Sequence, residues 1–373
     1  MPAAAASQSS SMVIRSLEGI ESLRTLWGNL LSGEAAPFQT FGWNLAWYRH
    51  YGDAYDEICL FVSSNQRAVF PMFRRGNFLR FAGDQICDYQ DVIATDPAHA
   101  RAGFEELLDW SRSRGLSLQL SRLSTAGLLY PIVQDQIAWT GWYEPVEKTL
   151  GPCPTFTVRQ SAEETLNHLP RKYRAEIRRQ GRRLESDFPG VKLEVTRAPD
   201  NQIEQLDRMV EFHRSQFARV GVNPLEDGRF VKLLSEICND PDVGFRLARM
   251  GNEETTMAED FTFVRGRRFY GFLMAFNREY ARYSPGTVML RNRLERLVKA
   301  GVETFDFLCG PEEYKYRFAT DEYFVRSVHL FPKTANGWMN WARLKGDYSL
   351  RNVAKWALVK LGLREAPGQR RQH

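Results

Sequence analysis

The sequence predicts an α/β fold with mixed sheets, divided into two domains. Helical and strand-like patterns alternate along the whole chain, which is typical of layered folds that combine helices with sheets. The 373 residues exceed what one ordinary hydrophobic core supports. A composition of 43% hydrophobic and 25% charged residues is that of a globular protein.

The first half begins with a helix and a pair of strands. Residues 38–52 carry apolar side chains at helical spacing, among them Phe41, Leu45 and Tyr48. The apolar runs 57–64 and 67–75 lie on either side of a polar turn at Asn65, so we expect two paired strands.

A boundary between the two halves is expected near residues 149–156. Before it, residues 103–115 predict a helix that Gly115 ends, and residues 116–123 alternate like a strand. The stretch 149–156 is rich in glycine, proline and cysteine, which favours a linker. The predicted units are a disordered tail over residues 1–11, domains over 12–155 and 156–346, and a basic amphipathic segment over 347–373.

The second half begins with a long helix near residues 161–187, followed by a strand at 190–196. One helix containing His213 and another after Asn223-Pro224 come next. The later elements are a hairpin of 257–264 with 268–276, an amphipathic helix from Gly286, strands near 303–308 and 323–331, and a last helix near 347–362.

Charge and cysteine content restrict the function classes. A net charge of +5 suits an anionic ligand or membrane surface and does not demand nucleic acid. The five cysteines contain no Cys-x-x-Cys pair, so we expect neither a metal site nor disulfides, and a reducing compartment. The N-terminus lacks a basic signal region, and no run of about 18 apolar residues occurs. We therefore expect a cytoplasmic protein, at most peripheral on a membrane.

A candidate anion site lies at the turn Ser284-Pro285-Gly286-Thr287, which opens the amphipathic helix. The first amides of a helix lack intrahelical partners, and the helix dipole is positive there, so a pyrophosphate fits. Arg291 adds attraction for phosphate. The alternative is an ordinary turn that caps a helix.

Several segments resemble the CelD/BcsL family of cellulose-biosynthesis-like acetyltransferases, which is related to the FemAB-type tandem GNAT proteins. The segments are 38–48, 171–185, the helix with His213, 283–290 and 305–318. The resemblance implies two GNAT-like domains, with acyl-CoA lying between two splayed strands of the second. The usual GNAT phosphate signature, Arg/Gln-x-x-Gly-x-Gly/Ala, is missing, because Arg178-x-x-Gly181-x-Arg183 fails at its last position.

The resemblance and the chemistry of acyl transfer give the catalytic candidates. Tyr314 is expected to protonate the CoA thiolate and Lys315 to polarise the carbonyl, unless Tyr314 packs under the sheet and Lys315 is solvated. His213 is the candidate base, unless it is structural. Asp306 is expected to orient Lys315 or His213, to act as base, or to form a structural ion pair. Glu259 is the remaining candidate.

Acceptor-binding candidates lie in both halves. Asp88, Tyr89 and Asp91 form a polar cluster that is either an acceptor-binding edge or a capped turn. Asp260 neighbours Glu259 on one strand, so the two side chains face opposite sides of the sheet and one of them faces the acceptor. Tyr283, directly before the Ser-Pro-Gly turn, is also a candidate.

Two basic segments suggest a polyanionic or membrane partner. Residues 171–183 contain seven Lys or Arg side chains, and residues 348–364 have an amphipathic stripe beside Trp356. A solvated helix and docking on the protein itself are the alternatives.

The function expected from these features is acyl transfer from acyl-CoA to an amine or hydroxyl, including N-acylation of a ceramide-like lipid. The alternatives are O-acetylation of a sugar or polysaccharide, FemAB-like transfer from aminoacyl-tRNA, and a non-catalytic polyanion-binding module. No metal is expected.

Overall fold

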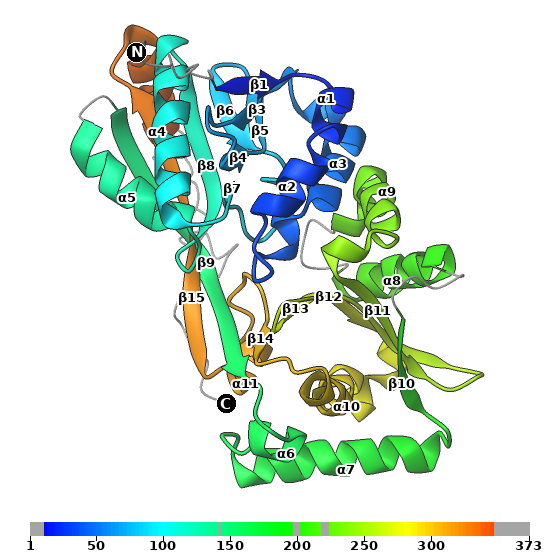
Figure 1. Cartoon of the computed structure of the whole chain (residues 1–373). Helices are drawn as coiled ribbons and strands as arrows, with labels where there is room; N and C mark the ends of the chain where they lie inside the picture. The colour runs from blue at the N-terminus through cyan, green and yellow to red at the C-terminus, as the bar shows by residue number, and fades with distance from the viewer. Residues whose placement is uncertain (1–10, 141–142, 197–201, 218–223, 347–373) are drawn as a thin grey trace, which may run out of the picture.

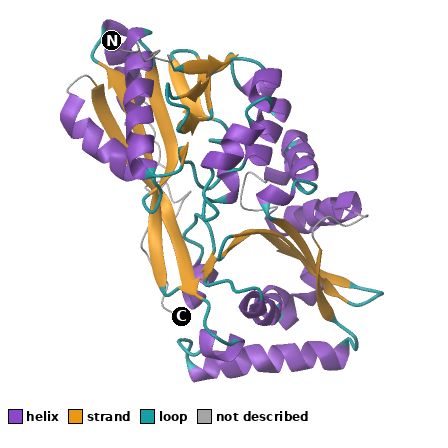
Figure 2. Ribbon diagram, in the orientation of Figure 1, coloured by secondary structure: helices purple, strands orange, loops and turns teal. Residues whose placement is uncertain are grey.

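The computed structural model describes residues 11–140, 143–196, 202–217 and 224–346. Helices cover both a small sheet and a long mixed sheet that runs through the molecule (Figures 1 and 2). The strand order is β1-β3-β4-β7 in the small sheet and β10-β11-β12-β13-β14-β9-β15-β8-β6-β5-β2 in the large one. The predicted α/β fold with mixed sheets is therefore confirmed.

The N-terminal half contains the small sheet and part of the large one. The expected strand pair is confirmed but divided: β3 and β4 pair in the small sheet, while β2 and β5 pair in the large one. The elements are β1 (Met12–Ile14), α1 (Leu17–Glu21), α2 (Arg24–Leu30), η1 (Pro37–Gln39), α3 (Phe41–His50), η2 (Gly52–Ala54), β2 (Glu57–Ile58), β3 (Leu60–Val62), β4 (Ala68–Phe70), β5 (Met72–Arg75), β6 (Phe78–Phe81), β7 (Ile93–Ala94), α4 (Pro97–Ser113), β8 (Ser117–Ser124), α5 (Leu129–Thr140) and β9 (Tyr143–Thr157).

The C-terminal half follows the predicted order of elements, with Pro170 dividing the first long helix into two. The strand β11 is an addition to the prediction. The elements are α6 (Ala162–Thr165), α7 (Arg171–Asp187), β10 (Lys192–Thr196), α8 (Gln202–Phe217), η3 (Pro224–Glu226), α9 (Gly228–Ile237), η4 (Pro241–Val243), β11 (Phe245–Gly251), β12 (Thr256–Arg265), β13 (Arg268–Phe276), η5 (Arg278–Tyr283), α10 (Pro285–Lys299), β14 (Thr304–Asp306), α11 (Glu313–Phe318) and β15 (Asp321–Pro332).

The stretch 149–156 is part of the long strand β9 rather than a linker. Proline has no backbone N–H to donate, but its carbonyl group can still accept a hydrogen bond from a neighbouring strand, so the prolines are tolerated here. Pro154 accepts from Phe307 at 3.0 Å, and Pro152 accepts from Gly310 at 2.9 Å. β9 thereby pairs with β14 and β15, and β15 pairs with β8, so one sheet joins the two halves. The domain limits at residues 155 and 156 remain a prediction.

A shared hydrophobic core also joins the halves. The sheet β10–β13 lies between α8 and α9 on one side and α10 on the other (Figure 1). Aromatic side chains of α3, such as Trp43, pack edge-on against Phe263 and Phe272 of the C-terminal half. The N-terminal helices thus stabilise the strands that follow β11.

The C-terminal part of the described chain returns to the N-terminal half. Residues 335–346 are helical, and Asn340 donates a hydrogen bond to Ser117 of β8 at 3.3 Å. The predicted tail, residues 1–11, lies outside the described residues except for Ser11, and the predicted segment 347–373 lies wholly outside them. Within the described part of the chain, no helix is both long and apolar enough to cross a membrane.

Candidate functional site

Strands β13 and β14 diverge in the middle of the large sheet. Their parallel pairing ends at Tyr270 opposite Asp306, although β13 continues to Phe276. After Asp306 the chain follows β9, because the amides of Phe307 and Gly310 donate to β9 carbonyls. We call the resulting gap the β13–β14 opening.

A β-bulge lies at the start of this opening. In the ladder with β12, Phe261 pairs with Leu273 and Thr262 pairs with Gly271, so Phe272 is an extra residue. A bulge bends its strand and leaves the extra residue outside the ladder. Beyond it, β13 presents apolar side chains that are only partly buried: Phe272, Leu273, Met274 and Phe276. The opening therefore has an apolar wall.

The N-terminus of α10 lies against this apolar wall. Ser284 has a left-handed backbone (φ 51°) and its side chain does not cap the helix, while Pro285 has no amide hydrogen. A Cβ atom on Gly286 would lie 2.9 Å from the Met274 methyl group, so glycine permits the close approach of helix and strand. The positive end of the helix dipole, with Thr287 in its first turn, thus adjoins the β13–β14 opening.

Arg291 lies farther along the same helix. It follows Pro285 by six residues, or about 9 Å along the axis at 1.5 Å per residue. Its guanidinium donates to the side chain of Asn292 at 3.3 Å. Helical side chains lean toward the N-terminus, which is the direction of the predicted phosphate site.

Asp306 is the centre of a buried hydrogen-bond cluster. One carboxylate oxygen accepts from the Tyr89 hydroxyl at 2.8 Å and from the Leu308 amide at 2.8 Å. The other accepts from Arg268 at 3.1 Å and from the Tyr323 hydroxyl at 2.5 Å. Because neither Lys315 nor His213 is a partner, the expectation that Asp306 orients one of them is corrected. Asp306 forms an ion pair with Arg268, as the structural alternative expected, and its role as a base stays a prediction.

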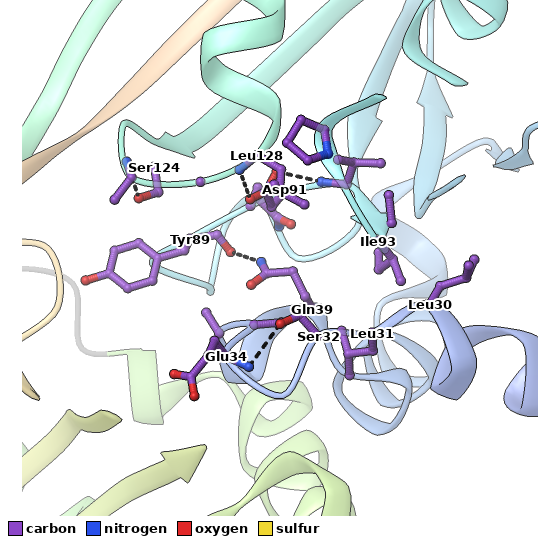
Figure 3. Close-up of a pocket in the computed structure, with 18 of the residues that line it drawn as sticks. Leu30, Leu31, Ser32, Glu34, Gln39, Tyr89, Asp91, Ile93, Ser124 and Leu128 are labelled. Atoms are coloured by element: carbon purple, nitrogen blue, oxygen red, sulfur yellow. Dashed lines mark hydrogen bonds between the residues drawn. The ribbon is translucent and has the colours of Figure 1, made fainter. Parts of the chain in front are cut away.

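A central cavity of about 450 Å³ lies between the two halves, above the Asp306 cluster. Tyr89, Arg268, Tyr270 and Tyr323 form one wall. Figure 3 shows the opposite walls, which come from the segments around Leu31, Glu34, Asp91 and Leu128. Gln39 holds the Tyr89 segment in place, because its amide donates to the Tyr89 carbonyl at 2.9 Å.

The polar cluster near residue 90 is divided between structural and cavity-lining roles. Asp91 accepts hydrogen bonds from the amides of Val92, Leu128 and Leu129 at 2.7–2.9 Å. Asp91 thus caps a turn, which was one of the two alternatives for this cluster. Burial raises the pKa of Asp91 to about 6. Asp88 lies 3.8 Å from Arg122, and its burial likewise raises its pKa to about 6, but it does not line the cavity.

Glu259 is paired with helix α8. It accepts two hydrogen bonds from Arg208, at 3.1 and 2.9 Å. Burial raises the pKa of Glu259 to about 7, although Arg208 opposes the shift. His213 shares the buried face of α8 with Leu206 and Met209, and this helix packs on β12 and β13. His213 therefore lies on the buried face of α8, the helix that packs on β13.

Asp260 and Tyr283 have structural partners on the α10 side of the sheet. Asp260 pairs with Arg293 of α10 at 2.5 Å, and burial raises the pKa of Asp260 to about 6. Tyr283 is buried, and its hydroxyl donates to Asp187 at the end of α7 at 2.7 Å. Neither residue lines the central cavity, so the structure separates them from Tyr89 and Asp91.

Tyr314 and Lys315 lie in different environments. The alternative expectation was a packed Tyr314 and a solvated Lys315, and the structure shows the reverse. Tyr314 is 45% exposed, and its ring meets Phe307 edge-on at 6.1 Å. Lys315 is buried rather than solvated. Its ammonium group contacts Glu312 at 2.8 Å and the Cys309 carbonyl at 3.1 Å. Lys315 therefore fixes the loop that follows β14.

The cavity wall includes residues that the sequence did not identify: Gln39, Arg268, Tyr270 and Tyr323. They come from separate segments, so no local motif marks them. One signal was present, because strand alternation places Arg268 and Tyr270 on the same side of β13.

Comparisons with known proteins agree with this architecture. Residues 171–316 match the family model described as acetyltransferase (GNAT) domain. Searching curated protein sequences gave no match.

Three solved structures have a similar fold. The C-terminal domain of a putative lysylphosphatidylglycerol synthetase from Agrobacterium fabrum has a TM-score of 0.54 at 14% identity, covering 86% of this chain and 94% of that one. L-PGS from Bacillus licheniformis has a TM-score of 0.55 at 14% identity, with coverages of 83% and 90%. FemX has a TM-score of 0.55 at 10% identity, with coverages of 86% and 96%. At these identities the likeness concerns the fold alone.

The expectation of an α/β fold with mixed sheets and a GNAT-like domain is thereby confirmed, while the second GNAT-like domain and the resemblance to CelD/BcsL proteins in particular stay predictions. The chain has a GNAT-like fold and carries, at residues 171–316, a segment that matches the GNAT acetyltransferase domain.

Proposed function

We propose that this chain transfers an acyl group from an acyl-CoA thioester to an amine or hydroxyl acceptor. The observation that carries the proposal is the β13–β14 opening, with its apolar wall next to the N-terminus of α10. The pantetheine arm lies in the opening, and the pyrophosphate meets the first amides of α10 near Gly286. Ser284, Thr287 and Arg291 surround the phosphates.

The acceptor enters through the central cavity. Its nitrogen or oxygen attacks the thioester carbonyl, and a base removes its proton. We assign the base to His213, because α8 packs on β13. Exposed Tyr314 returns a proton to the CoA thiolate, while Lys315 positions the loop after β14 rather than polarising the carbonyl.

The test is the mass of the product after the protein is incubated with acetyl-CoA or a long-chain acyl-CoA and a panel of acceptors. A product heavier by one acyl group, with release of free CoA, is expected from an amine, an amphiphilic amino lipid or a sugar. The acceptor that reacts distinguishes N-acylation of a ceramide-like lipid from O-acetylation of a saccharide. If neither acyl-CoA nor aminoacyl-tRNA is consumed, the protein is a non-catalytic polyanion-binding module.

His213→Ala tests the assignment of the base. We expect turnover to fall about 100-fold while acyl-CoA affinity stays unchanged, which is the usual effect of losing a general base. Near-normal turnover by a folded variant would exclude His213 from this role.

A second candidate donor is an aminoacyl group carried by tRNA. Fold likeness to a putative lysylphosphatidylglycerol synthetase motivates it, and so do the exposed basic side chains of α7, including Arg171, Arg178 and Arg182. Replacing acyl-CoA by aminoacyl-tRNA in the same assay decides between the donors, because only this reaction adds an amino acid to the acceptor.

A further inference from the structure

Tyr270 has a hydroxyl group without a partner in the central cavity. Its side chain is 98% buried and lines the cavity. Within the part of the chain that the structure describes, no side chain or backbone group hydrogen-bonds its hydroxyl. The hydroxyl is not among the fully enclosed polar atoms, so it opens onto the cavity and is available to a ligand there.

The other two cavity-lining tyrosines differ from Tyr270 in this respect. The hydroxyls of Tyr89 and Tyr323 both donate to Asp306. Tyr270 also occupies a particular position on β13, because it forms the last ladder pair before the strands diverge. It therefore belongs both to the cavity wall and to the start of the β13–β14 opening.

We propose that Tyr270 is a catalytic residue that donates a hydrogen bond to the oxyanion formed during acyl transfer. This inference rests on the proposed function. The acceptor lone pair forms a bond to the thioester carbon, and the carbonyl π electrons move to the oxygen. The Tyr270 hydroxyl donates a hydrogen bond to the resulting oxyanion. Collapse of this intermediate breaks the C–S bond, and CoA leaves as the thiolate. The proton lost by the acceptor goes to the base, and the thiolate takes up one proton.

The surroundings of Tyr270 favour a donor that keeps its proton. Burial raises its pKa, and the nearby negative charge of Asp306 adds to the shift. A neutral phenol can donate to an oxyanion without proton transfer, and such donors are most effective where water is excluded.

Tyr270→Phe tests this role, because it removes only the hydroxyl and no internal hydrogen bond. We expect kcat to fall about 100-fold, the effect of removing one oxyanion donor, with acyl-CoA affinity unchanged by calorimetry. Tyr51→Phe is the control, since Tyr51 is equally buried but does not line the cavity. Tyr270→Leu, which also lacks the hydroxyl, serves if the first variant unfolds.

A second measurement uses a CoA analogue with a tetrahedral phosphonate in place of the thioester carbonyl. Wild type should bind it more tightly than CoA, and Tyr270→Phe should lose that gain. If wild type is active and Tyr270→Phe retains at least a third of its kcat, the role of Tyr270 is wrong while the proposed function stands. If wild type neither binds nor consumes acyl-CoA, both are wrong.

Discussion

Among single residues, Asp306 has the largest influence on the architecture of the site. Its carboxylate joins Tyr89 of the N-terminal half to Arg268 of β13 and Tyr323 of β15. Each of these donors lines the central cavity. The buried carboxylate of Asp306 therefore fixes the positions of three side chains in the cavity wall.

Asp306→Asn should weaken this wall. The amide offers one acceptor oxygen where the carboxylate offered two, and it leaves Arg268 without its counter-charge. Breaking a buried ion pair costs about 3 kcal/mol, which we expect as the loss of unfolding free energy in urea. Asp321→Asn, at an exposed carboxylate, is the control. A loss below about 1 kcal/mol would mean that the cluster does not support the fold.

Glu259 should make stability depend on pH. Its folded pKa, about 7, lies above the ordinary value of 4.5, so the folded state binds the proton more tightly. Stability is therefore highest below pH 4.5 as far as this group is concerned, and it falls as pH rises toward 7. By linkage the fall is on the order of 3 kcal/mol.

Glu259→Gln keeps the shape and cannot titrate, so its unfolding free energy should decline less between pH 5 and 7.5. Urea unfolding at several pH values measures the difference between the variants. Parallel curves for wild type and variant would show that Glu259 does not carry the raised pKa.

At the scale of elements, the proposed donor site depends on the fit of α10 against β13. Gly286 permits contact with Met274, and the bulge at Phe272 turns β13 away from β14. The helix thus begins beside an apolar wall. The proposed function needs such a pairing, because a CoA thioester combines anionic phosphates with an extended arm.

Gly286→Asp should lower acyl-CoA affinity at least tenfold. The substitution places a carboxylate at the phosphate position and a Cβ atom against Met274. Calorimetry on folded protein measures the affinity. Gly228→Asp, at the start of α9, introduces the same charge at another helix N-terminus with open space around it. Equal affinities for the two variants would place the donor site elsewhere.

At the scale of the whole molecule, one sheet and one core make the two halves interdependent. The N-terminal half supplies Tyr89 and the outer cavity wall, while the C-terminal half supplies the β13–β14 opening. The basic helix α7 and the helical residues 335–346 lie at opposite ends of the molecule (Figure 1). The membrane-binding surface that we predict at α7 is thus separate from the end of the described chain.

Binding to anionic vesicles should depend on the exposed arginines of α7. Each basic group near anionic lipid contributes about 1 kcal/mol, so the double variant Arg178→Glu/Arg182→Glu should bind at least tenfold more weakly. High salt should weaken wild type in the same way. Liposome co-sedimentation measures this, with Arg67→Glu/Arg112→Glu, at exposed arginines of the N-terminal half, as the control.

Truncation after Asp347 tests the C-terminal segment separately and should also weaken binding, without loss of turnover on a soluble acceptor. If full-length protein stays in the supernatant at low salt, the acceptor is a soluble sugar or amine rather than a lipid.

The sequence by itself determined the elements whose pattern is local. The hairpin around Gly266, the helix from Pro285 and the strands on either side of it follow from apolar periodicity and from turn residues. The Ser-Pro-Gly turn is a similar case, because one short segment defines both the end of the loop and the start of the helix. These features sufficed to predict the order of the elements, while the GNAT-like fold was implied by the family resemblance and the donor end of the site stays a prediction.

Only the tertiary structure decided which distant residues meet. Tyr89 and Asp306 are 217 positions apart, and no local rule pairs them. The proline-rich stretch 149–156 forms a strand because its carbonyl groups accept hydrogen bonds from backbone amides of the segment after β14. Tyr270 became a candidate for the same reason. The tertiary structure brings Asp306 to the hydroxyls of Tyr89 and Tyr323 and leaves the Tyr270 hydroxyl without such a partner. Sequence periodicity determines which face of an element a side chain lies on, while tertiary packing of distant segments determines which residues it contacts.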